Sequence, residues 1–380
     1  MSELTEGEVA ERIARIGDQF AINGDFLYGE ELRNGHINTT YRACYRTEEG
    51  HLDRYILQRI NDYVFKDPAL VMKNVEKVTR HISWKVMRRR KNAAGQTLTL
   101  YPARGGRSYI NLPEEGGMWR CYNNIEGTHT YDVVENTRQA YQAGYAFGSF
   151  QELVSDMNPD DIRESIPDFH NTPKRYEALM QSAEKDELGR AASCREELEQ
   201  VRAWAPQLGK LVEMQRAGQL PTRITHNDTK INNVMLDEDS DSAVCVIDLD
   251  TVMPGLSLYD FGDMVRTATC MAEEDEADLS KVHMQMPFFE SLAEGYLDAT
   301  HSFLTKNEID LLAFSGWLIT VEIGMRFLTD YLDGDKYFRI HYAEHNLVRA
   351  RNQFALAKSI QSMLPQMQKH IRKLVNSYSD

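Results

Sequence analysis

The sequence predicts a two-lobed α+β protein. Residues 1–125 form a small antiparallel sheet with one helix, and residues 126–380 form a larger, mainly helical part. In the first part, short segments such as 41–45 and 118–122 alternate between apolar and polar residues, as strands do. After residue 126 the apolar residues recur at helical spacing instead. A chain of 380 residues is also long enough for two hydrophobic cores.

The first part opens with a helix and continues with short strands. Thr5 and Glu8 have the spacing of a capping box, so a helix begins there. Short apolar runs at 55–57 and 98–101 follow, between turns that contain glycine. One helix interrupts these strands and begins near Asp67, because an Asp followed by Pro is typical of a helix cap and first turn.

The second part is helical except for one segment. Helical periodicity appears at residues 136–157, 172–192, 195–217, 278–304 and 344–375. Between these helices, residues 224–236 and 243–249 read as short strands and loops rich in Asn, Asp and β-branched side chains. Irregular polar backbone within a helical region indicates a functional site.

Composition limits the partners and the compartment. The 43 Lys+Arg against 58 Asp+Glu give a net charge of −15, which argues against binding to nucleic acid or to an anionic membrane. The basic run at 88–91 is therefore interpreted as a solvated loop. Five scattered cysteines without a metal-ligand spacing fit reduced thiols. The acidic start lacks the features of a signal peptide, and no segment was expected to span a membrane, so we expect a cytoplasmic protein.

The segment from 225 to 233 contains the pattern H-x-D-x-K-x-x-N, which has the register of a kinase catalytic loop. Phosphoryl transfer needs an acceptor for the proton of the substrate hydroxyl, a cation for the charge on the transferred group, and an oxygen ligand for Mg²⁺. Asp228, Lys230 and Asn233 supply these three groups. His226 is interpreted as a buried histidine that holds the loop, since Asp228 already fills the role of base.

A metal site also needs a carboxylate. Asp248 ends an apolar strand 15 residues after Asn233 and is the expected main Mg²⁺ ligand. Asp260 begins a literal Asp-Phe-Gly triplet, but it precedes a helical pattern and is interpreted as a structural cap or a loop anchor. Asp250 has three open interpretations: a carboxylate behind the metal ligand, a second Mg²⁺ contact, or a contact to the substrate.

Candidate nucleotide contacts lie in the first part of the chain. Asn34, Gly35 and His36 belong to a turn before a strand that is expected to cover phosphates, although a plain hairpin is the alternative. In the third strand Gln58 stands where a kinase would have lysine. Arg59 follows on the opposite strand face and is the expected cation. Glu76 of the helix is its expected partner, and a solvated helix glutamate is the alternative.

The chain resembles the aminoglycoside phosphotransferase and choline kinase superfamily, through the pattern at 226–233 and the strand-end Asp248. Within it, the blocks NGHINTTY (34–41), YILQ (55–58), THNDTK (225–230), IDLDT (247–251), MPG (253–255) and GMRFL (324–328) resemble bacterial N-acetylhexosamine 1-kinases. The resemblance covers most of the chain. It implies a bilobal protein-kinase-like fold and transfer of the γ-phosphoryl of ATP, with Mg²⁺, to the anomeric hydroxyl of N-acetylglucosamine or N-acetylgalactosamine.

The acceptor is expected to bind against the helix at 315–332. Glu322, Arg326 and Asp330 follow at intervals of four residues on one face of this helix. One interpretation is an internal ladder of ion pairs; the other is that Arg326 and Asp330 contact the substrate. Two further hypotheses stay open: a kinase for choline, homoserine or an aminoglycoside, and a nucleotide-binding scaffold without activity.

Overall fold

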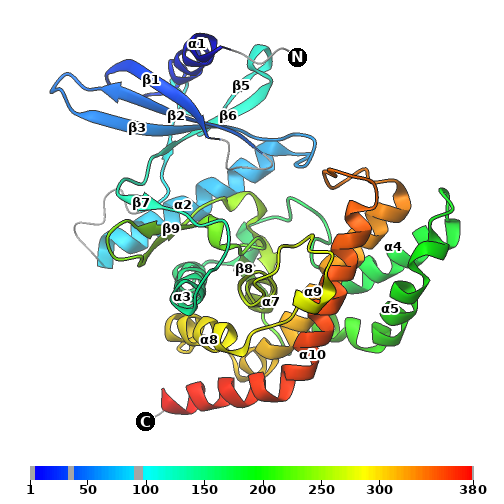
Figure 1. Cartoon of the computed structure of the whole chain (residues 1–380). Coiled ribbons are helices and arrows are strands. Elements are labelled where there is room, and N and C mark those ends of the chain that lie inside the picture. The colour runs from blue at the N-terminus through cyan, green and yellow to red at the C-terminus, as the bar shows by residue number, and fades with distance from the viewer. Residues whose placement is uncertain (1–4, 33–37, 90–96, 379–380) are drawn as a thin grey trace. The chain divides into compact units, whose positions relative to one another are not determined.

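The computed structural model describes residues 5–32, 38–89 and 97–378, and the chain divides into two compact units. Unit 1 comprises Met1–His129 together with Val244–Val252, and unit 2 comprises Thr130–Ala243 and Met253–Asp380. The fold is the protein-kinase-like bilobal one, with an antiparallel N-terminal sheet and a mainly helical remainder (Figure 1). The division differs from the expected one at 125/126, because a segment of nine residues from the second half of the sequence packs into unit 1.

Unit 1 is an antiparallel sheet with a helix on each side. Helix α1 (Glu6–Gly17) begins with the expected capping box of Thr5 and Glu8. The sheet has the order β1-β2-β3-β6-β4, with β5 also paired to β6. Its strands are β1 (Asp25–Leu32), β2 (Thr39–Arg46), β3 (Leu52–Arg59), β4 (Leu100–Tyr101), β5 (Ile110–Leu112) and β6 (Gly117–Asn123), and the second helix is α2 (Pro68–Arg89). The short strand β7 (Thr128–His129) follows.

The two faces of this sheet carry different chemistry. Side chains alternate between the faces along a strand, so Leu57 and Trp119 lie on one face and Gln58 and Arg120 on the other. The first face forms the apolar core with Ile13 and Ile16 of α1. The second face is polar, and Arg120 contacts the sulfur of Met72 in α2. Figure 1 shows α1 and α2 on opposite sides of the strands.

The segment Val244–Val252 belongs to unit 1 through buried polar contacts. It contains the end of β10 (Ala243–Val246) and the short 3₁₀ turn η5 (Leu249–Thr251). Asn74 of α2 donates a hydrogen bond of 3.3 Å to the carbonyl of Val252, and Arg120 of β6 forms an ion pair with Asp250. These contacts join residues that are more than a hundred positions apart in the sequence.

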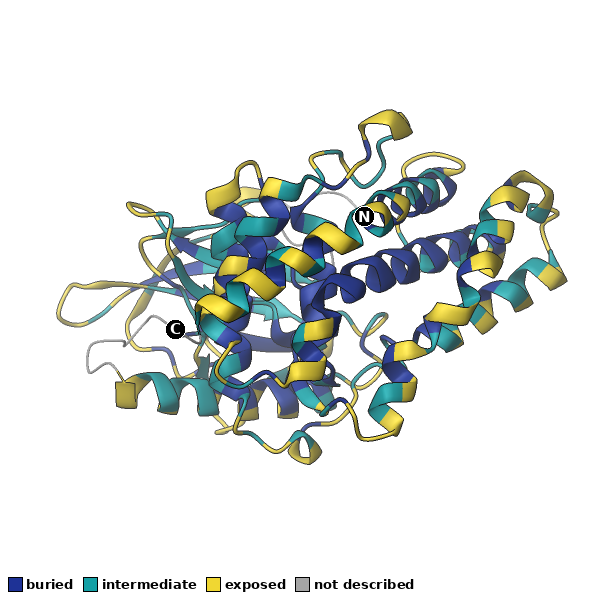
Figure 2. Cartoon of the chain, turned by 90° about the horizontal axis from the view of Figure 1, so that it is seen from below, coloured by how far each residue is buried: buried dark blue, intermediate teal, exposed yellow. Residues whose placement is uncertain are grey.

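Unit 2 is built around one buried helix, α9 (Lys306–Asp333), which packs against α4, α7 and α10. Most of α9 is buried, and buried residues are dark blue in Figure 2. The other helices are α3 (Thr137–Val154), α4 (Thr172–Lys185), α5 (Arg195–Leu208), α6 (Lys210–Arg216), α7 (Ser257–Ala268), α8 (Met286–Thr300) and α10 (His345–Ser377). Strand β8 (Arg223–Thr225) pairs antiparallel with β11 (Met253–Gly255). The loop that follows β8 leads into β9 (Val234–Asp237).

Helix α9 also corrects one expectation from the sequence. Among the described residues it is the one helix that is long and apolar enough to cross a membrane by length and composition, contrary to the expectation that no segment would reach this length. However, 89% of its most apolar window is buried inside the protein. This burial is typical of the core helix of a globular unit.

Candidate active site

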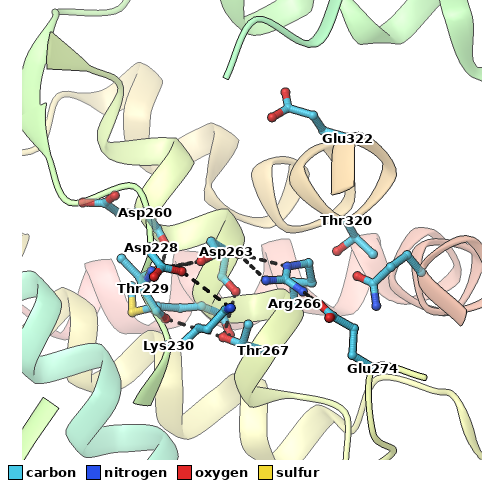
Figure 3. A network of polar contacts seen from close by, with 12 residues as sticks. Asp228, Thr229, Lys230, Asp260, Asp263, Arg266, Thr267, Glu274, Thr320 and Glu322 are labelled. Atoms are coloured by element: carbon cyan, nitrogen blue, oxygen red, sulfur yellow. Dashed lines mark hydrogen bonds and ion pairs between the residues drawn. The ribbon is translucent and has the colours of Figure 1, made fainter. Parts of the chain in front are cut away.

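The loop after β8 brings Asp228, Lys230 and Asn233 together, as the sequence predicted. The Nζ of Lys230 lies 3.7 Å from Oδ1 of Asp228. The Nδ2 of Asn233 donates to the backbone carbonyl of Asp228 at 2.9 Å and to its Oδ2 at 3.2 Å. The side chains of Asp228 and Lys230 keep 32% and 43% of their surface exposed, so a substrate can reach both. Figure 3 shows the two side chains pointing toward each other.

Asp260 at the start of α7 holds this loop from behind. Its carboxylate accepts hydrogen bonds from the backbone N–H of His226 at 2.9 Å and of Asn227 at 2.7 Å, and from Nε2 of Gln151 at 2.8 Å. Burial raises the pKa of Asp260, and His226 and the donors oppose that rise. The interpretation of Asp260 as a loop anchor is confirmed, and the Asp-Phe-Gly triplet lies inside a helix.

His226 is buried, as expected for a histidine that holds the loop. It has no exposed surface, and the rings of Phe147 and Phe150 meet it edge-on at centroid distances of 5.2 and 5.7 Å. The backbone N–H of Asp228 donates to its Nδ1 at 3.3 Å. The histidine therefore fixes the backbone of Asp228.

A second anchor, Asp263, was missed in the sequence. Its Oδ2 accepts from the backbone N–H of Thr229 at 2.9 Å, and Arg266 donates to its Oδ1 at 2.9 Å. Arg266 also pairs with Glu274 (Figure 3). The available signal was the spacing, since Asp260, Asp263 and Arg266 follow at intervals of three on one helix and therefore share a face.

These charges also affect Lys230. The carboxylate of Asp228 raises the pKa of Lys230; burial opposes this rise and Glu274 adds to it. Burial by itself would raise the pKa of Asp263, but Arg266 and Lys230 bring it below its ordinary value. At neutral pH Lys230 is therefore charged and Asp263 is ionised.

The residues expected to hold Mg²⁺ have suitable chemistry. Both hydrogen bonds of Asn233 use its Nδ2, which leaves its Oδ1 as an oxygen ligand of the kind that Mg²⁺ prefers. Asp248 follows β10 with a left-handed backbone, at a φ of 58°, and Arg120 and Asp248 attract each other within unit 1. Within the described ranges, no three His, Cys, Asp or Glu residues form a metal-binding group by themselves. Mg²⁺ commonly takes one or two protein carboxylates and completes its shell with phosphates and water.

Arg59 is not placed as the sequence predicted. Its guanidinium donates to the carbonyl of Gly116 at 2.9 Å, and Glu76 accepts a hydrogen bond of 3.2 Å from Ser108. The expected Arg59–Glu76 pair is therefore wrong. The physical reason is the alternation along β3, which puts Arg59 on the α1 face of the sheet and Gln58 on the α2 face. Whether Arg59 or Glu76 contacts a nucleotide stays a prediction.

Arg120 is a buried cation on the α2 face, which sequence reasoning missed. Its guanidinium donates to Oε1 of Gln58 at 3.0 and 2.5 Å and forms an ion pair with Asp250. Asp250 also accepts from Nδ2 of Asn38 at 2.7 Å, and Gln58 donates to Thr40 at 3.0 Å. The two charged side chains are 0% and 2% exposed. Burial opposes the charge on Arg120, but Asp250 raises the pKa of the guanidinium above its ordinary value.

This placement changes the interpretation of Asp250. Its two carboxylate oxygens bind Arg120 and Asn38, and almost none of its surface is exposed. The expectation of a direct substrate contact does not fit such a buried, paired carboxylate. Of the three interpretations, a carboxylate behind the metal ligand fits best, because Asp250 fixes the turn that follows Asp248. Asn34, Gly35 and His36, expected to cover the phosphates, lie outside the described residues.

The internal ladder does not form, because Glu322, Arg326 and Asp330 of α9 have partners outside that helix. Glu322 binds His170 at 2.8 Å and Thr172 at 2.5 Å. The guanidinium of Arg326 lies over the ring of Phe169 at 5.2 Å, and also over the rings of two residues near the end of α9, Tyr337 and Phe338.

Asp330 was expected to contact the substrate, but its carboxylate is instead bound to groups of the protein. Its carboxylate accepts from the backbone N–H groups of Lys336, Tyr337 and Phe338 at 2.8–2.9 Å, and from Asn346 at 2.9 Å. It therefore anchors the loop that follows α9. The sequence placed these residues on one face correctly, but it could not show which segments pack against that face.

Comparisons with known proteins agree with this geometry. The profile of the Phosphotransferase enzyme family matches residues 29–301. An aminoglycoside phosphotransferase from Alicyclobacillus acidocaldarius has a similar structure, with a TM-score of 0.57, 12% identity, and coverage of 94% of this chain and 96% of that one. A choline kinase from Cryptosporidium parvum gives a TM-score of 0.55, 12% identity and coverage of 96% and 99%. A microcompartment-associated aminopropanol kinase gives a TM-score of 0.54, 14% identity, and coverage of 94% of this chain and 98% of that one.

The family match extends over more than half of the chain and includes the catalytic loop and Asp248, so the chain belongs to the Phosphotransferase enzyme family. The description of this family as phosphotransferases agrees with the kinase-like catalytic loop at 226–233. The structural likenesses, at 12–14% identity, show the shared fold.

Proposed function

We propose that this protein is an N-acetylhexosamine 1-kinase, which transfers the γ-phosphoryl of ATP to the anomeric hydroxyl of N-acetylglucosamine or N-acetylgalactosamine. The observation that carries phosphoryl transfer is the cluster around Asp228, in which Lys230 lies 3.7 Å from its carboxylate and Asn233 donates to its carbonyl and carboxylate at 2.9 and 3.2 Å. The sugar is supported by the resemblance of six sequence blocks to kinases of this kind, one of which contains Arg326. We place the activity in the cytoplasm, in the salvage of amino sugars.

In this mechanism Asp228 orients the acceptor hydroxyl and accepts its proton. Its position is fixed because the loop backbone is held by Asp260 and Asp263, and because Asn233 binds both its carbonyl and its carboxylate. Lys230 stays charged and stabilises the negative charge on the transferred phosphoryl group. Such fixed positioning supplies much of the acceleration in phosphoryl transfer.

Asn233 and Asp248 would hold Mg²⁺, which neutralises charge on the phosphates when it is bound. In unit 1, Arg120 is proposed to take the place that lysine occupies in the third strand of kinases. It acts by holding Asp250, and thereby the turn η5 that begins after Asp248. Gln58, at the lysine position itself, orients the guanidinium through two hydrogen bonds.

A kinase for another small hydroxyl compound is the alternative, since a choline kinase and an aminopropanol kinase share the fold. Choline recognition would need a cage of aromatic rings around a quaternary ammonium group. A scaffold without activity is disfavoured because Asp228, Lys230, Asn233 and Asp248 are all present.

The test is Mg²⁺-dependent ATP consumption by the purified protein. The acceptors are N-acetylglucosamine, N-acetylgalactosamine, glucose, galactose, choline, homoserine and kanamycin, and the Asp228→Asn variant is the control. Turnover with the two N-acetylhexosamines that is lost in the variant supports the proposal, and phosphorus NMR of the product identifies the phosphorylated hydroxyl. Turnover with choline, homoserine or kanamycin alone contradicts the sugar assignment and keeps the roles of the catalytic loop.

A further inference from the structure

A cavity of about 350 Å³ lies entirely within unit 2, beside the catalytic loop. Asn227, the neighbour of the catalytic Asp228, forms part of its wall, together with residues 164–171, the end of α6 and strand β11. This volume is within the range of roughly 300–1,000 Å³ that small-molecule sites occupy. The cavity is thus large enough for a ligand and is one residue from the proposed base.

One polar atom in the wall of this cavity has no partner. His170 is 7% exposed, and its Nδ1 forms a hydrogen bond of 2.8 Å with Oε1 of Glu322. Its Nε2 is buried without a hydrogen-bond partner among the described residues. Leaving a buried polar atom without a hydrogen bond is unfavourable. A ligand that supplies the missing hydrogen bond recovers this free energy on binding.

The Nδ1 side of the His170 ring is held in place by Glu322. Burial by itself would raise the pKa of Glu322, but His170, together with Thr172 and Arg175, brings it below its ordinary value. Glu322 is therefore ionised at neutral pH and can only accept hydrogen bonds, so Nδ1 of His170 is the donor. A carboxylate that accepts from one ring nitrogen fixes the orientation of the other.

Two residues of helix α9, one turn apart, contact side chains of this wall. Glu322 binds His170, and the guanidinium of Arg326, one turn later, lies 5.2 Å over the ring of Phe169, which also lines the cavity. The ring of Tyr259 lies 5.0 Å from that of His170 and completes an aromatic side. Glu164 adds a carboxylate to the same wall. Aromatic faces combined with polar groups suit a ring that carries several hydroxyl groups.

We propose that this cavity is the acceptor subsite and that Nε2 of His170 hydrogen-bonds a hydroxyl of an uncharged, polyhydroxylated ring. The inference rests on the proposed function for the identity of the sugar, and it adds a specificity-determining residue that the sequence did not single out. His170 is 58 residues from Asp228 in the chain, and the resemblance blocks do not include it.

Two substitutions of His170 distinguish the roles of its two ring nitrogens. In His170→Asn the amide takes the place of Nδ1, so the bond to Glu322 is kept and the unpaired Nε2 is lost. In His170→Gln the amide reaches the place of Nε2. We expect His170→Asn to raise the KM for N-acetylglucosamine about tenfold or more, with the KM for ATP unchanged, because one hydrogen bond to the ligand is lost. His170→Gln should recover part of this loss.

The matched control is His301→Asn. His301 is an exposed histidine of unit 2, which stacks on Tyr378 and donates from Nδ1 to the carbonyl of Leu297, and it is not one of the lining residues. It should leave both KM values unchanged. Thermal unfolding of all three variants shows whether a change in KM is accompanied by a loss of folded protein.

Binding is measured in parallel, by saturation-transfer NMR with N-acetylglucosamine, N-acetylgalactosamine, glucose and choline as probes. Binding of a sugar that is lost in His170→Asn and kept in His301→Asn supports the subsite. If the sugar binds but is not phosphorylated, the proposed function fails and the subsite stands. If the sugar is phosphorylated with an unchanged KM in His170→Asn, the subsite is overturned and the function stands. Binding of none of the sugars to the wild type overturns the subsite as well.

Discussion

The catalytic loop of unit 2 and the polar face of the sheet in unit 1 use buried charge in different ways. In unit 2 the carboxylates of Asp260 and Asp263 accept backbone N–H groups of the loop and thereby fix its course. In unit 1 the charge of Asp250 is neutralised by the guanidinium of Arg120, a side chain from a distant strand. The first arrangement shapes a backbone, and the second joins separate elements.

The exposure of the charged side chains differs accordingly. Asp228 and Lys230 keep 32% and 43% of their side-chain surface exposed, whereas Arg120 and Asp250 are almost fully buried. A group that reacts has to reach its substrate, so the exposed pair can be catalytic. A fully buried ion pair can only position its neighbours. Substitutions in the two regions should therefore separate loss of turnover from loss of stability.

The largest effect is expected at Asp228. In Asp228→Asn we expect kcat to fall by roughly 10²–10⁴-fold, because general-base catalysis contributes about this much. The KM for ATP and the thermal stability should stay close to wild type, since the amide keeps the shape of the side chain. Steady-state kinetics and thermal unfolding measure both quantities. A variant that retains near-normal kcat would contradict the assignment of Asp228 as the base.

The second prediction concerns Arg120. In Arg120→Met the buried carboxylate of Asp250 loses its charge partner, which costs about 3–5 kcal/mol when one member of a buried pair is removed. The double variant Arg120→Met/Asp250→Leu should lose less than Arg120→Met alone, because no uncompensated charge remains. Hydrogen exchange of the β3 and β6 peptides measures this effect within unit 1.

Arg12→Met is the matched control for that comparison. Arg12 pairs with Glu115 in the same unit at 2.8 Å, but its side chain is 23% exposed. We expect it to cost less than Arg120→Met and to leave the KM for Mg-ATP unchanged. Equal losses from the two substitutions would show that the burial of the Arg120 pair has no special effect.

The third prediction tests the backbone anchor in unit 2. Asp260 accepts two loop N–H groups, and Asp260→Asn replaces one accepting oxygen by a donor. The unsatisfied amide should cost about 1–3 kcal/mol of the free energy of unfolding. Because the loop then loses its fixed course, kcat should fall while the KM for ATP changes little. Unchanged kcat in a folded, destabilised variant would show that Asp260 stabilises the unit without positioning Asp228.

The smallest effect is a pH dependence in unit 2. Burial by itself would raise the pKa of Glu308, but hydrogen bonds from Arg223, Ser257 and Thr305 bring it below the ordinary value of 4.5. The stability that comes from this ionised form is complete above pH 4.5 and is lost as the pH falls through the lowered folded-state pKa. Arg120 in unit 1 stays charged throughout this range.

Glu308→Gln removes this titration. The difference in melting temperature between wild type and variant should therefore shrink as the pH falls below 4.5. Thermal unfolding at several pH values between neutral and acid measures it. A difference that stays constant over that range would show that Glu308 is not held ionised by its partners.

Local patterns in the sequence determined the architecture of both units and the core of the catalytic loop. Alternating residues along β2, β3 and β6 predict a sheet, and the spacing of Asp228, Lys230 and Asn233 within six residues predicts their cluster. The identity of Asp260 as an anchor also followed from its place before a helical pattern. These features depend on backbone geometry over a few residues, which a linear pattern can express.

Only the tertiary structure decided which distant side chains meet. The alternation along β3 puts Arg59 on the face of the sheet opposite to α2. Only the strand order showed that β6 places Arg120 beside Gln58, where it also reaches Asp250, which is 130 positions from Arg120 in the sequence. Likewise, the face of α9 was evident from its sequence, whereas the partners of Glu322 and Asp330 come from the loops that pack on it. Buried polar groups must find a hydrogen-bonding partner, and packing rather than sequence distance determines which one is within reach.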